Sequence, residues 1–318
     1  VFDGDGEMTY EEHVLDVLLL YPEDNTIIIT WDNTGWSDLG SFILQDAFDG
    51  LLGIDIDMTT INSLTLTNPA FTTLKLKITQ HSGEIVIDYL ADWNLVGLPA
   101  EVEDANYLTI FPDAVENTLF SFDVTYNLDT MLVNGDGYWL KFNDAGTTTI
   151  TGAPLNELTI TLAQDWNLIS GIAETISVYS IIDPDGIIVE NTLFGFDLTY
   201  VSSDELVAGK GYWIRTFEAG DITLTSDATA RVASQDYSLN ANSISINGLD
   251  LYFGVELSAK ERLIYSLPPK PPAGAFDVRF KDGWRAVKDY GEVEVMPTTE
   301  TLTITYDIML NAGEYYNW

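Results

Sequence analysis

Apolar and polar residues alternate in several short stretches of this chain. The stretches are 63–67, 73–79, 158–162, 221–225, 243–247 and 301–305. A period of two places leucine and isoleucine on one face and mostly threonine or serine on the other, as half-buried antiparallel strands require. Turn signals such as Asn134-Gly135 and Asp183-Pro184-Asp185-Gly186 separate such stretches. We therefore predict an all-β protein of tandem antiparallel β-sandwich modules, with a single short helix over residues 8–21.

Three blocks of sequence occur twice in the middle of the chain. Residues 92–95, 116–123 and 135–139 return as 165–168, 190–197 and 209–213. Each copy is about 70 residues long, which is marginal for an independent core, so we expect the copies to pack against each other or against their neighbours. The resulting division is an acidic loop and helix (1–24), an N-terminal β domain (25–81), two β repeats (82–152 and 153–227) and a C-terminal β domain (228–318).

The two copies retain the same aromatic and acidic positions. The retained aromatic pairs are Trp93/Trp166, Phe120/Phe194, Phe122/Phe196, Tyr138/Tyr212 and Trp139/Trp213. We interpret these rings as core, with stacking platforms for sugars as the alternative. The retained acids are Asp92/Asp165, Glu116/Glu190 and Asp123/Asp197. We interpret them as turn-capping residues, with calcium ligation or catalysis as alternatives.

The composition excludes several classes of function. The 318 residues contain 50 acidic and 13 basic side chains, two histidines and no cysteine, giving a net charge of −37. Disulfides, cysteine-ligated metals and thiol chemistry are therefore impossible, and the acidic balance argues against nucleic acid as a partner. No apolar run reaches the roughly 18 residues of a membrane-spanning helix. A surface this acidic suits salty water or bound divalent cations.

The first twelve residues fit most of a calcium-binding loop of the EF-hand type. Asp3, Asp5 and Glu12 supply carboxylates at loop positions 3, 5 and 12, Gly6 gives the sharp turn, and Glu7 contributes its backbone carbonyl. Val1 departs from the expected aspartate. We predict calcium ligation by Asp3, Asp5, Glu7 and Glu12, with an acidic helix start as the alternative. The chain begins inside this motif without a methionine, from which we expect a processed or trimmed product.

Motifs for catalysis are absent from the sequence. The two histidines, His13 and His81, lack a second histidine at metal-ligand spacing, and no hydrolase, P-loop or dinucleotide-binding fingerprint occurs. With 50 acids, a close carboxylate pair has no discriminating power. We therefore expect a protein without enzymatic activity.

A proline-rich segment, residues 267–276, precedes another alternating stretch at 276–280. It predicts a polyproline II crossover within a β domain, with a docking peptide for an aromatic groove as the alternative.

The repeated Asp-Trp-Asn-Leu and Gly-x-Gly-Tyr-Trp blocks, together with the segment 265–280, resemble modules of large secreted bacterial surface proteins. In that group such modules commonly precede a C-terminal sorting domain recognised by the type IX secretion route. The resemblance covers roughly residues 82–318 and implies export, β-sandwich modules and an extracellular or cell-surface location. No sorting domain is visible after Trp318, so we expect that it was removed on export or lies beyond this chain.

Two functions from different classes remain. The first is a structural or adhesive surface protein that associates with itself, or with another surface protein or glycan, and that can form filaments or a surface layer. The second is an accessory, carbohydrate-binding region of a larger exported hydrolase. The second function needs exposed aromatic rings, and the unrepeated candidates are Trp31, Trp36, Trp284 and Trp318.

Overall fold

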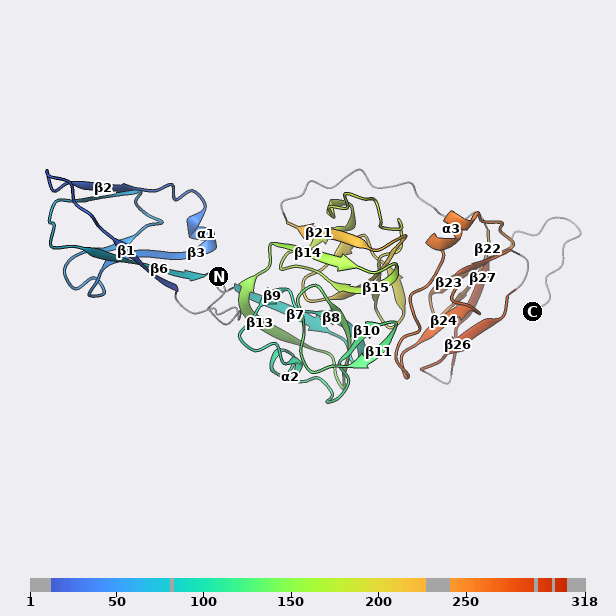
Figure 1. The fold of residues 1–318 in the computed structure, drawn as a ribbon. Coiled ribbons are helices and arrows are strands. Elements are labelled where there is room, and N and C mark those ends of the chain that lie inside the picture. The colour runs from blue at the N-terminus through green and yellow to red at the C-terminus, as the bar shows by residue number, and fades with distance from the viewer. Residues whose placement is uncertain (1–12, 81–82, 227–240, 289–290, 299–300, 308–318) are drawn as a thin grey trace, which may run out of the picture. The chain divides into compact units, whose positions relative to one another are not determined.

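A computed structural model describes residues 13–80, 83–226, 241–288, 291–298 and 301–307 (Figure 1). The regular secondary structure of these residues is mostly antiparallel β-sheet, which confirms the all-β prediction. The chain divides into two compact units, one within residues 1–84 and 151–153 and the other within 85–150 and 154–318. None of the helices among the described residues is long and apolar enough to cross a membrane.

The first unit is a small two-sheet sandwich. Its larger sheet has the order β1-β6-β3-β4 and its smaller sheet pairs β2 with β5. The strands are β1 (His13–Leu18), β2 (Ile27–Thr30), β3 (Gly40–Asp46), β4 (Asp55–Asp57), β5 (Ser63–Leu66) and β6 (Thr73–Gln80), and a single turn of helix, α1 (Trp36–Leu39), precedes β3. Apolar side chains of both sheets, including Leu44, Leu66 and Leu74, form one core.

The helix predicted over residues 8–21 is wrong where the structure describes it, because residues 13–18 form β1. β1 pairs antiparallel with β6 from His13 opposite Ile78 to Leu18 opposite Thr73, which sets Asp16 against Lys75. Val17, Leu19 and Tyr21 contact the core at a spacing of two residues. A short apolar run does not distinguish helix from strand by itself, and here the available partner strand decides.

The second unit begins with two modules that use the same strand arrangement. The first module has a four-stranded sheet, β11-β10-β12-β8, and the second has the corresponding sheet β18-β17-β20-β15. In the first module these are β8 (Asp92–Gly97), β10 (Phe120–Asp123), β11 (Thr125–Leu128) and β12 (Gly137–Phe142). In the second they are β15 (Asp165–Ser170), β17 (Phe194–Phe196), β18 (Tyr200–Ser202) and β20 (Gly211–Thr216).

Further strands complete each module. The first module adds a sheet of β7 (Gly83–Tyr89), β13 (Gly146–Pro154) and β9 (Ala100–Glu101), and one helical turn, α2 (Tyr107–Ile110). The second adds the pairs β14 (Glu157–Leu162) with β21 (Gly220–Thr225) and β16 (Ile176–Ser177) with β19 (Glu205–Leu206), and a 3₁₀ turn, η1 (Val178–Ser180). Each module has its own apolar core.

The C-terminal domain of the second unit, residues 241–307, contains two more sheets. One has the order β25-β23-β22-β27 and the other pairs β24 with β26. The strands are β22 (Asn242–Ile246), β23 (Leu249–Phe253), β24 (Asp277–Phe280), β25 (Ala286–Val287), β26 (Val293–Met296) and β27 (Ile304–Asp307). Helix α3 (Ala259–Ile264) starts with a capping box, in which Ser258 and Glu261 satisfy each other's backbone N–H groups.

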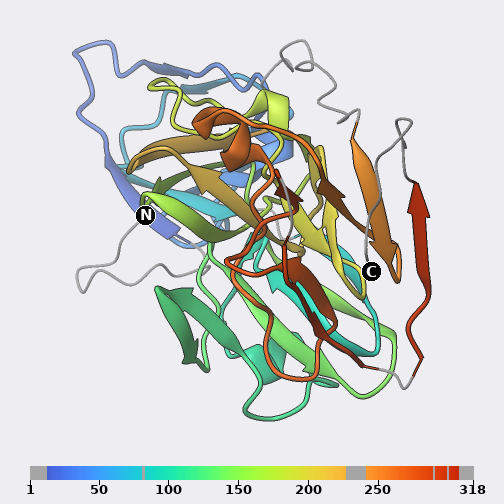
Figure 2. The same cartoon turned by 90° about the vertical axis from the view of Figure 1, so that its right-hand side faces the viewer.

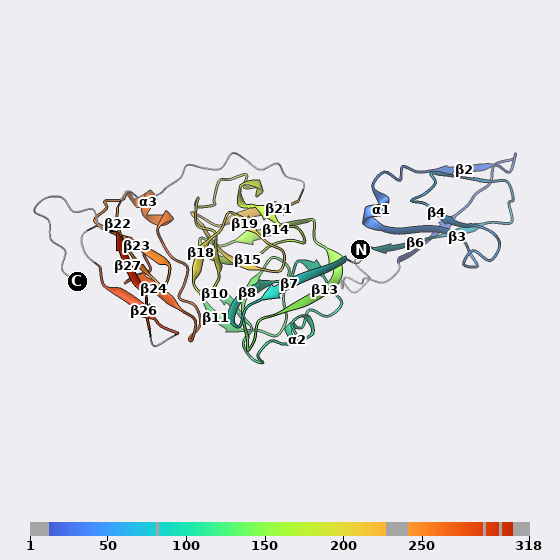
Figure 3. The same ribbon diagram turned by 180° about the vertical axis from the view of Figure 1, so that it is seen from behind.

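The C-terminal domain shares a core with both modules. Trp139 of the first module, Trp213 of the second and Val278 of the C-terminal domain belong to one buried cluster. Figure 2 shows the C-terminal sheets in front of the module strands, and Figure 3 shows β10, β11 and β18 on the side of the modules that faces this domain. The second unit is therefore held together by residues from three segments of the chain.

Candidate functional site

The predicted calcium ligands Asp3, Asp5, Glu7 and Glu12 lie outside the described residues, so calcium binding at this loop stays a prediction. Within the described ranges, no three histidine, aspartate or glutamate side chains converge in an arrangement that could hold a metal ion. His13 is the first residue of β1, and His81 is not among the described residues.

Duplicated aromatic rings, above all Trp139, Trp213, Phe122 and Phe196, form the seam between the two modules. Trp139 and Trp213 have no exposed surface, and both contact rings of the opposite module edge to face. The centroid of Trp139 lies 4.7 Å from that of Phe196, and the centroid of Trp213 lies 4.8 Å from that of Phe122. Trp139 corresponds to Trp213 and Phe122 to Phe196, so each module contributes the same two rings to the contact with the other. The seam has approximate two-fold symmetry. The interpretation of the retained rings as core is confirmed for the six that are buried: Trp93, Trp139, Trp213, Phe194, Tyr138 and Tyr212. The other four, Phe120, Phe122, Trp166 and Phe196, pack against the cluster that contains Trp139 and Trp213 but stay partly exposed.

Backbone contacts across the seam obey the same symmetry. Val96 bridges Lys210, and Ile169, which corresponds to Val96, bridges Asp136, which corresponds to Lys210. The N–H of Gly97 donates to the carbonyl of Gly209 at 3.1 Å. In the matching contact, the N–H of Ser170 donates to the carbonyl of Gly135 at 2.9 Å.

The second glycine of each Gly-x-Gly-Tyr-Trp block is required by this close approach. A Cβ on Gly137 would lie 2.4 Å from the carbonyl oxygen of Ile169, and one on Gly211 would lie 2.8 Å from that of Val96. The first glycine of each block is needed for a different reason. Gly135 and Gly209 adopt φ angles of 88° and 74°, which glycine reaches without strain.

The retained aspartates at the start of β8 and β15 each form an ion pair with the neighbouring strand of their sheet. Asp92 and Asp165 have φ angles of 73° and 81°. Asp92 forms an ion pair with Lys141 at 3.1 Å, and Asp165 forms one with Arg215 at 2.7 Å. The adjacent turn in each module is capped instead by the asparagine two residues after the aspartate. In the first module the side chain of Asn94 accepts from the N–H of Leu90 and donates to the carbonyl of Leu90.

The proline-rich segment joins α3 to β24, as expected of a crossover, and it is also bound by rings of both modules. The hydroxyls of Tyr200 and Tyr126 donate to the carbonyls of Pro269 and Lys270 at 2.7 and 2.8 Å. The indole N–H of Trp93 donates to the carbonyl of Ala273 at 3.3 Å. Burial raises the pKa of both tyrosine hydroxyls, so both remain protonated donors.

A buried ion pair fixes the strand that follows this segment. Arg279 forms a two-pronged pair with Asp277, with N–O distances of 2.6 and 2.7 Å, and donates a third hydrogen bond to the carbonyl of Pro268. Both side chains are almost completely buried. Such a pair is stable because every charged atom is compensated by a partner.

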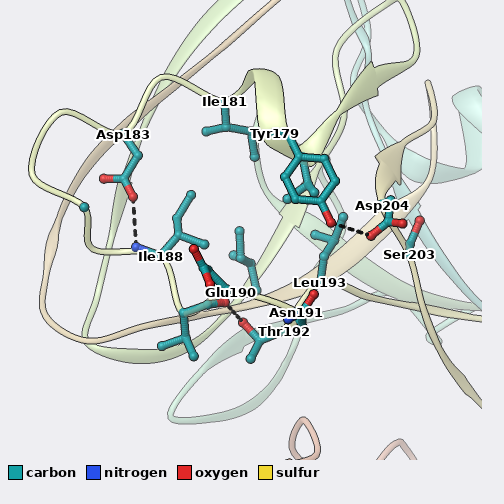
Figure 4. Close-up of a pocket in the computed structure, with 14 residues that line it drawn as sticks. Tyr179, Ile181, Asp183, Ile188, Glu190, Asn191, Thr192, Leu193, Ser203 and Asp204 are labelled. Atoms are coloured by element: carbon teal, nitrogen blue, oxygen red, sulfur yellow. Dashed lines mark hydrogen bonds between the residues drawn. The ribbon is translucent and has the colours of Figure 1, made fainter. Parts of the chain in front are cut away.

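The second module contains a cavity of about 240 Å³. Figure 4 shows it between η1, the 183–193 loop and the start of β19. Three carboxylates line it, those of Asp183, Glu190 and Asp204, and its wall contains apolar side chains such as Ile181 and Leu193. The hydroxyl of Tyr179 donates to Asp204 at 3.2 Å at one side. At the other side, Asp183 accepts from the N–H groups of residues 187 and 188, each at 3.0 Å.

Sequence reasoning identified one of these residues, Glu190, as a retained acid, and missed Tyr179, Asp183 and Asp204. The available signal was a difference between the copies: Val178 in the second module takes the position that Tyr107 has in the first. This correspondence lies outside the three repeated blocks.

The three unrepeated tryptophans that the structure describes, Trp31, Trp36 and Trp284, are only partly exposed. Trp31 and Trp36 pack against the core of the first unit, and the indole N–H of Trp31 donates to the carbonyl of Met58 at 2.9 Å. Trp284 is half-buried, with the guanidinium of Arg262 4.3 Å from its ring centroid. Trp318 lies outside the described residues.

No family model, curated protein or solved structure matches this chain.

Proposed function

We propose that this protein is a non-enzymatic structural or adhesive protein, exported to the cell surface or the extracellular space. One observation carries this proposal: aromatic side chains at corresponding positions of the two copies join the modules to each other and to the C-terminal domain. Trp139, Trp213 and their partners fill the seam, and Trp93, Tyr126 and Tyr200 bind the segment that leads into β24. Such a preassembled unit suits a scaffold that presents its outer faces.

The net charge determines how copies of this scaffold associate. At −37, two copies repel each other over the Debye length, which is about 30 Å at 0.01 M ionic strength and about 8 Å at 0.15 M. Self-association therefore requires screening or bridging cations. Salt provides screening alone, whereas calcium at equal ionic strength also bridges carboxylates.

The test uses the full chain at low salt, at 0.15 M sodium chloride, and with calcium chloride at matched ionic strength. Sedimentation velocity and negative-stain images should show filaments or clusters that increase with salt and increase further with calcium. The variant Asp3→Ala/Glu12→Ala is the matched control for the terminal loop. Monodisperse monomers under all three conditions, and no adhesion of protein-coated beads to one another, would contradict the proposal.

A groove between the second module and the C-terminal domain supports a second candidate function, carbohydrate binding. It measures about 540 Å³ and is lined by Trp166 and Trp284. Four cations line it, and each is paired with a carboxylate at 2.6–3.2 Å, so the groove is locally close to neutral in an acidic protein; they are Arg215, Lys270, Arg279 and Lys281. Aromatic faces flanked by paired polar groups suit a neutral sugar.

A glycan array separates the two functions. Accessory carbohydrate binding predicts hits that Trp284→Ala removes and that Trp31→Ala leaves unchanged, because Trp31 packs in the first unit. An array without hits would exclude this second function and leave the structural one standing.

A further inference from the structure

One of the differences between the two modules, a valine in the place of a tyrosine, leaves space for the cavity of the second module. The N–H of Tyr107 donates to the carbonyl of Thr130 at 3.1 Å, and the N–H of Val178 donates to the carbonyl of Asp204 at 2.8 Å. The residue before each is a cap: Asn106 accepts from the N–H of Leu108, and Ser177 accepts from that of Tyr179. Val178 therefore stands where the first module has Tyr107.

In the first module the phenol ring of Tyr107 fills this space. Tyr107 is 4% exposed, and its hydroxyl accepts a hydrogen bond from the N–H of Asn117 at 2.8 Å. Asn191 corresponds to Asn117, and the two have φ angles of 59° and 60°. In the second module a valine side chain cannot reach this N–H, and Val178, Asn191 and Asp204 all line the cavity. The cavity thus retains the wall and the donor that hold a phenol in the first module.

The size of the cavity fits a single ring. An engineered cavity of about 150 Å³ binds benzene, whereas sites for drug-sized ligands measure about 300–1,000 Å³. At about 240 Å³, the cavity accommodates one aromatic ring with a short substituent. Ile181, Leu193 and Ile214 provide apolar contacts for the ring.

The charged residues that line the cavity favour phenols with a positive charge over phenols with a negative charge. Asp183, Glu190 and Asp204 line the cavity, and none of its lining residues is a lysine or arginine. In Figure 4, Asp183 lies on one side of the opening and Asp204 on the other. A ligand with a positive charge is attracted to these carboxylates, and one with a negative charge is repelled.

We propose that this cavity binds a phenolic ring that carries a cationic amine, with the ring in the space that Tyr107 occupies in the first module. The phenol oxygen accepts from the N–H of Asn191, and the amine lies near Asp204. The ligand chemistry occurs both in free phenolic amines and in peptides with an N-terminal tyrosine. This site is independent of the proposed structural role.

Calorimetric titration of the full chain tests the proposal with a matched series of probes: tyramine, p-cresol, 4-hydroxyphenylacetate and the peptide Tyr-Gly-Gly amide. Tyramine should bind saturably with a dissociation constant of about 1 mM, as expected of so small a ligand. It should bind at least threefold more tightly than p-cresol, and 4-hydroxyphenylacetate should bind most weakly. Binding of the peptide as tightly as tyramine identifies a peptide terminus as the natural source. Weaker peptide binding identifies a free amine.

Two variants test the position of the site. Val178→Tyr fills the cavity with a tyrosine ring of the protein itself and should weaken tyramine binding at least tenfold. Asp204→Asn should retain p-cresol binding and lose the preference for tyramine, which keeps the test decisive if Val178→Tyr fails to fold. No saturation by about 20 mM tyramine, or a preference that Asp204→Asn leaves unchanged, would overturn the proposal.

Discussion

Replacing Gly137 with alanine would place a methyl group inside the seam, where the backbone of the second module leaves no room for it. The new Cβ would lie 2.4 Å from the carbonyl oxygen of Ile169 and 2.9 Å from its carbonyl carbon. Carbon–oxygen contacts in proteins shorten only to about 3.3 Å, so the two strands would have to separate by about 0.9 Å. Separation on this scale also disturbs the ring contacts beside it.

The expected loss of stability follows from two opposing contributions. Overpacking costs about 1–3 kcal/mol, and the lower entropy of the unfolded chain after replacing glycine returns about 0.4–1 kcal/mol. The obstructing atoms belong to the backbone and cannot rotate away, so we expect a net loss of about 2 kcal/mol. In a unit of this size that loss lowers Tm by roughly 4–8 °C.

Urea and thermal unfolding of three variants measure this effect. Gly211→Ala, the symmetry-related change, meets the carbonyl oxygen of Val96 at 2.8 Å and should destabilise the second unit less than Gly137→Ala. Gly195→Ala is the control, because its Cβ would make only ordinary contacts, with Tyr212 at 3.4 Å and Val201 at 3.9 Å. It should change stability by less than about 0.5 kcal/mol. If all three variants unfold with the same free energy, the close approach of the two modules at Gly137 and Gly211 would be refuted.

Three further predictions concern other parts of the chain. Asp277→Asn leaves Arg279 buried without its counter-charge and should cost about 3–5 kcal/mol in urea unfolding of the second unit, whereas Asp277→Leu/Arg279→Met should restore most of the loss. Burial alone would raise the pKa of Asp46, but hydrogen bonds from the N–H groups of residues 48, 52 and 54 lower it. The ionised Asp46 therefore stabilises the folded state at pH values above its unfolded pKa, which is near 4. This stabilisation is lost as the pH falls through the lower pKa of the folded state. The stability of the first unit should therefore decline less between pH 7 and pH 3 in Asp46→Asn than in the wild type, and an equal decline would contradict this. Calcium at a hundredfold excess over its dissociation constant should raise stability by about 2.7 kcal/mol in the wild type and not in Asp3→Ala/Glu12→Ala, and no shift in the wild type would end the calcium prediction.

Alternation of apolar and polar residues predicted many strands correctly. The stretches at 63–67, 73–79 and 158–162 correspond to β5, β6 and β14. Strands buried on both faces, such as β12 and β20, carry no alternation, so the pattern did not predict them. The helix over 8–21 failed because its apolar run is short and β6 supplied a partner strand.

The cavity of the second module could not be predicted, because it depends on the absence of a large side chain at one position. Its existence follows from Val178 standing in the place of Tyr107, and the intervening loops differ in length between the copies. The seam was foreseen only as an expectation that the copies pack together. Which residues meet, and that Gly137 and Gly211 make the approach possible, depends on strand positions that no local pattern encodes.

Native-state hydrogen exchange on the full chain tests the central claim most directly, which is that the repeated blocks join the two modules and the C-terminal domain into one unit. The slowest amides of β12, β20 and β24 should exchange through a common opening, with free energies that agree within about 1 kcal/mol. Their free energies should fall together in Gly137→Ala. Exchange of β24 through a separate opening, several kcal/mol easier than that of β12 and β20 and unaffected by Gly137→Ala, would contradict the account.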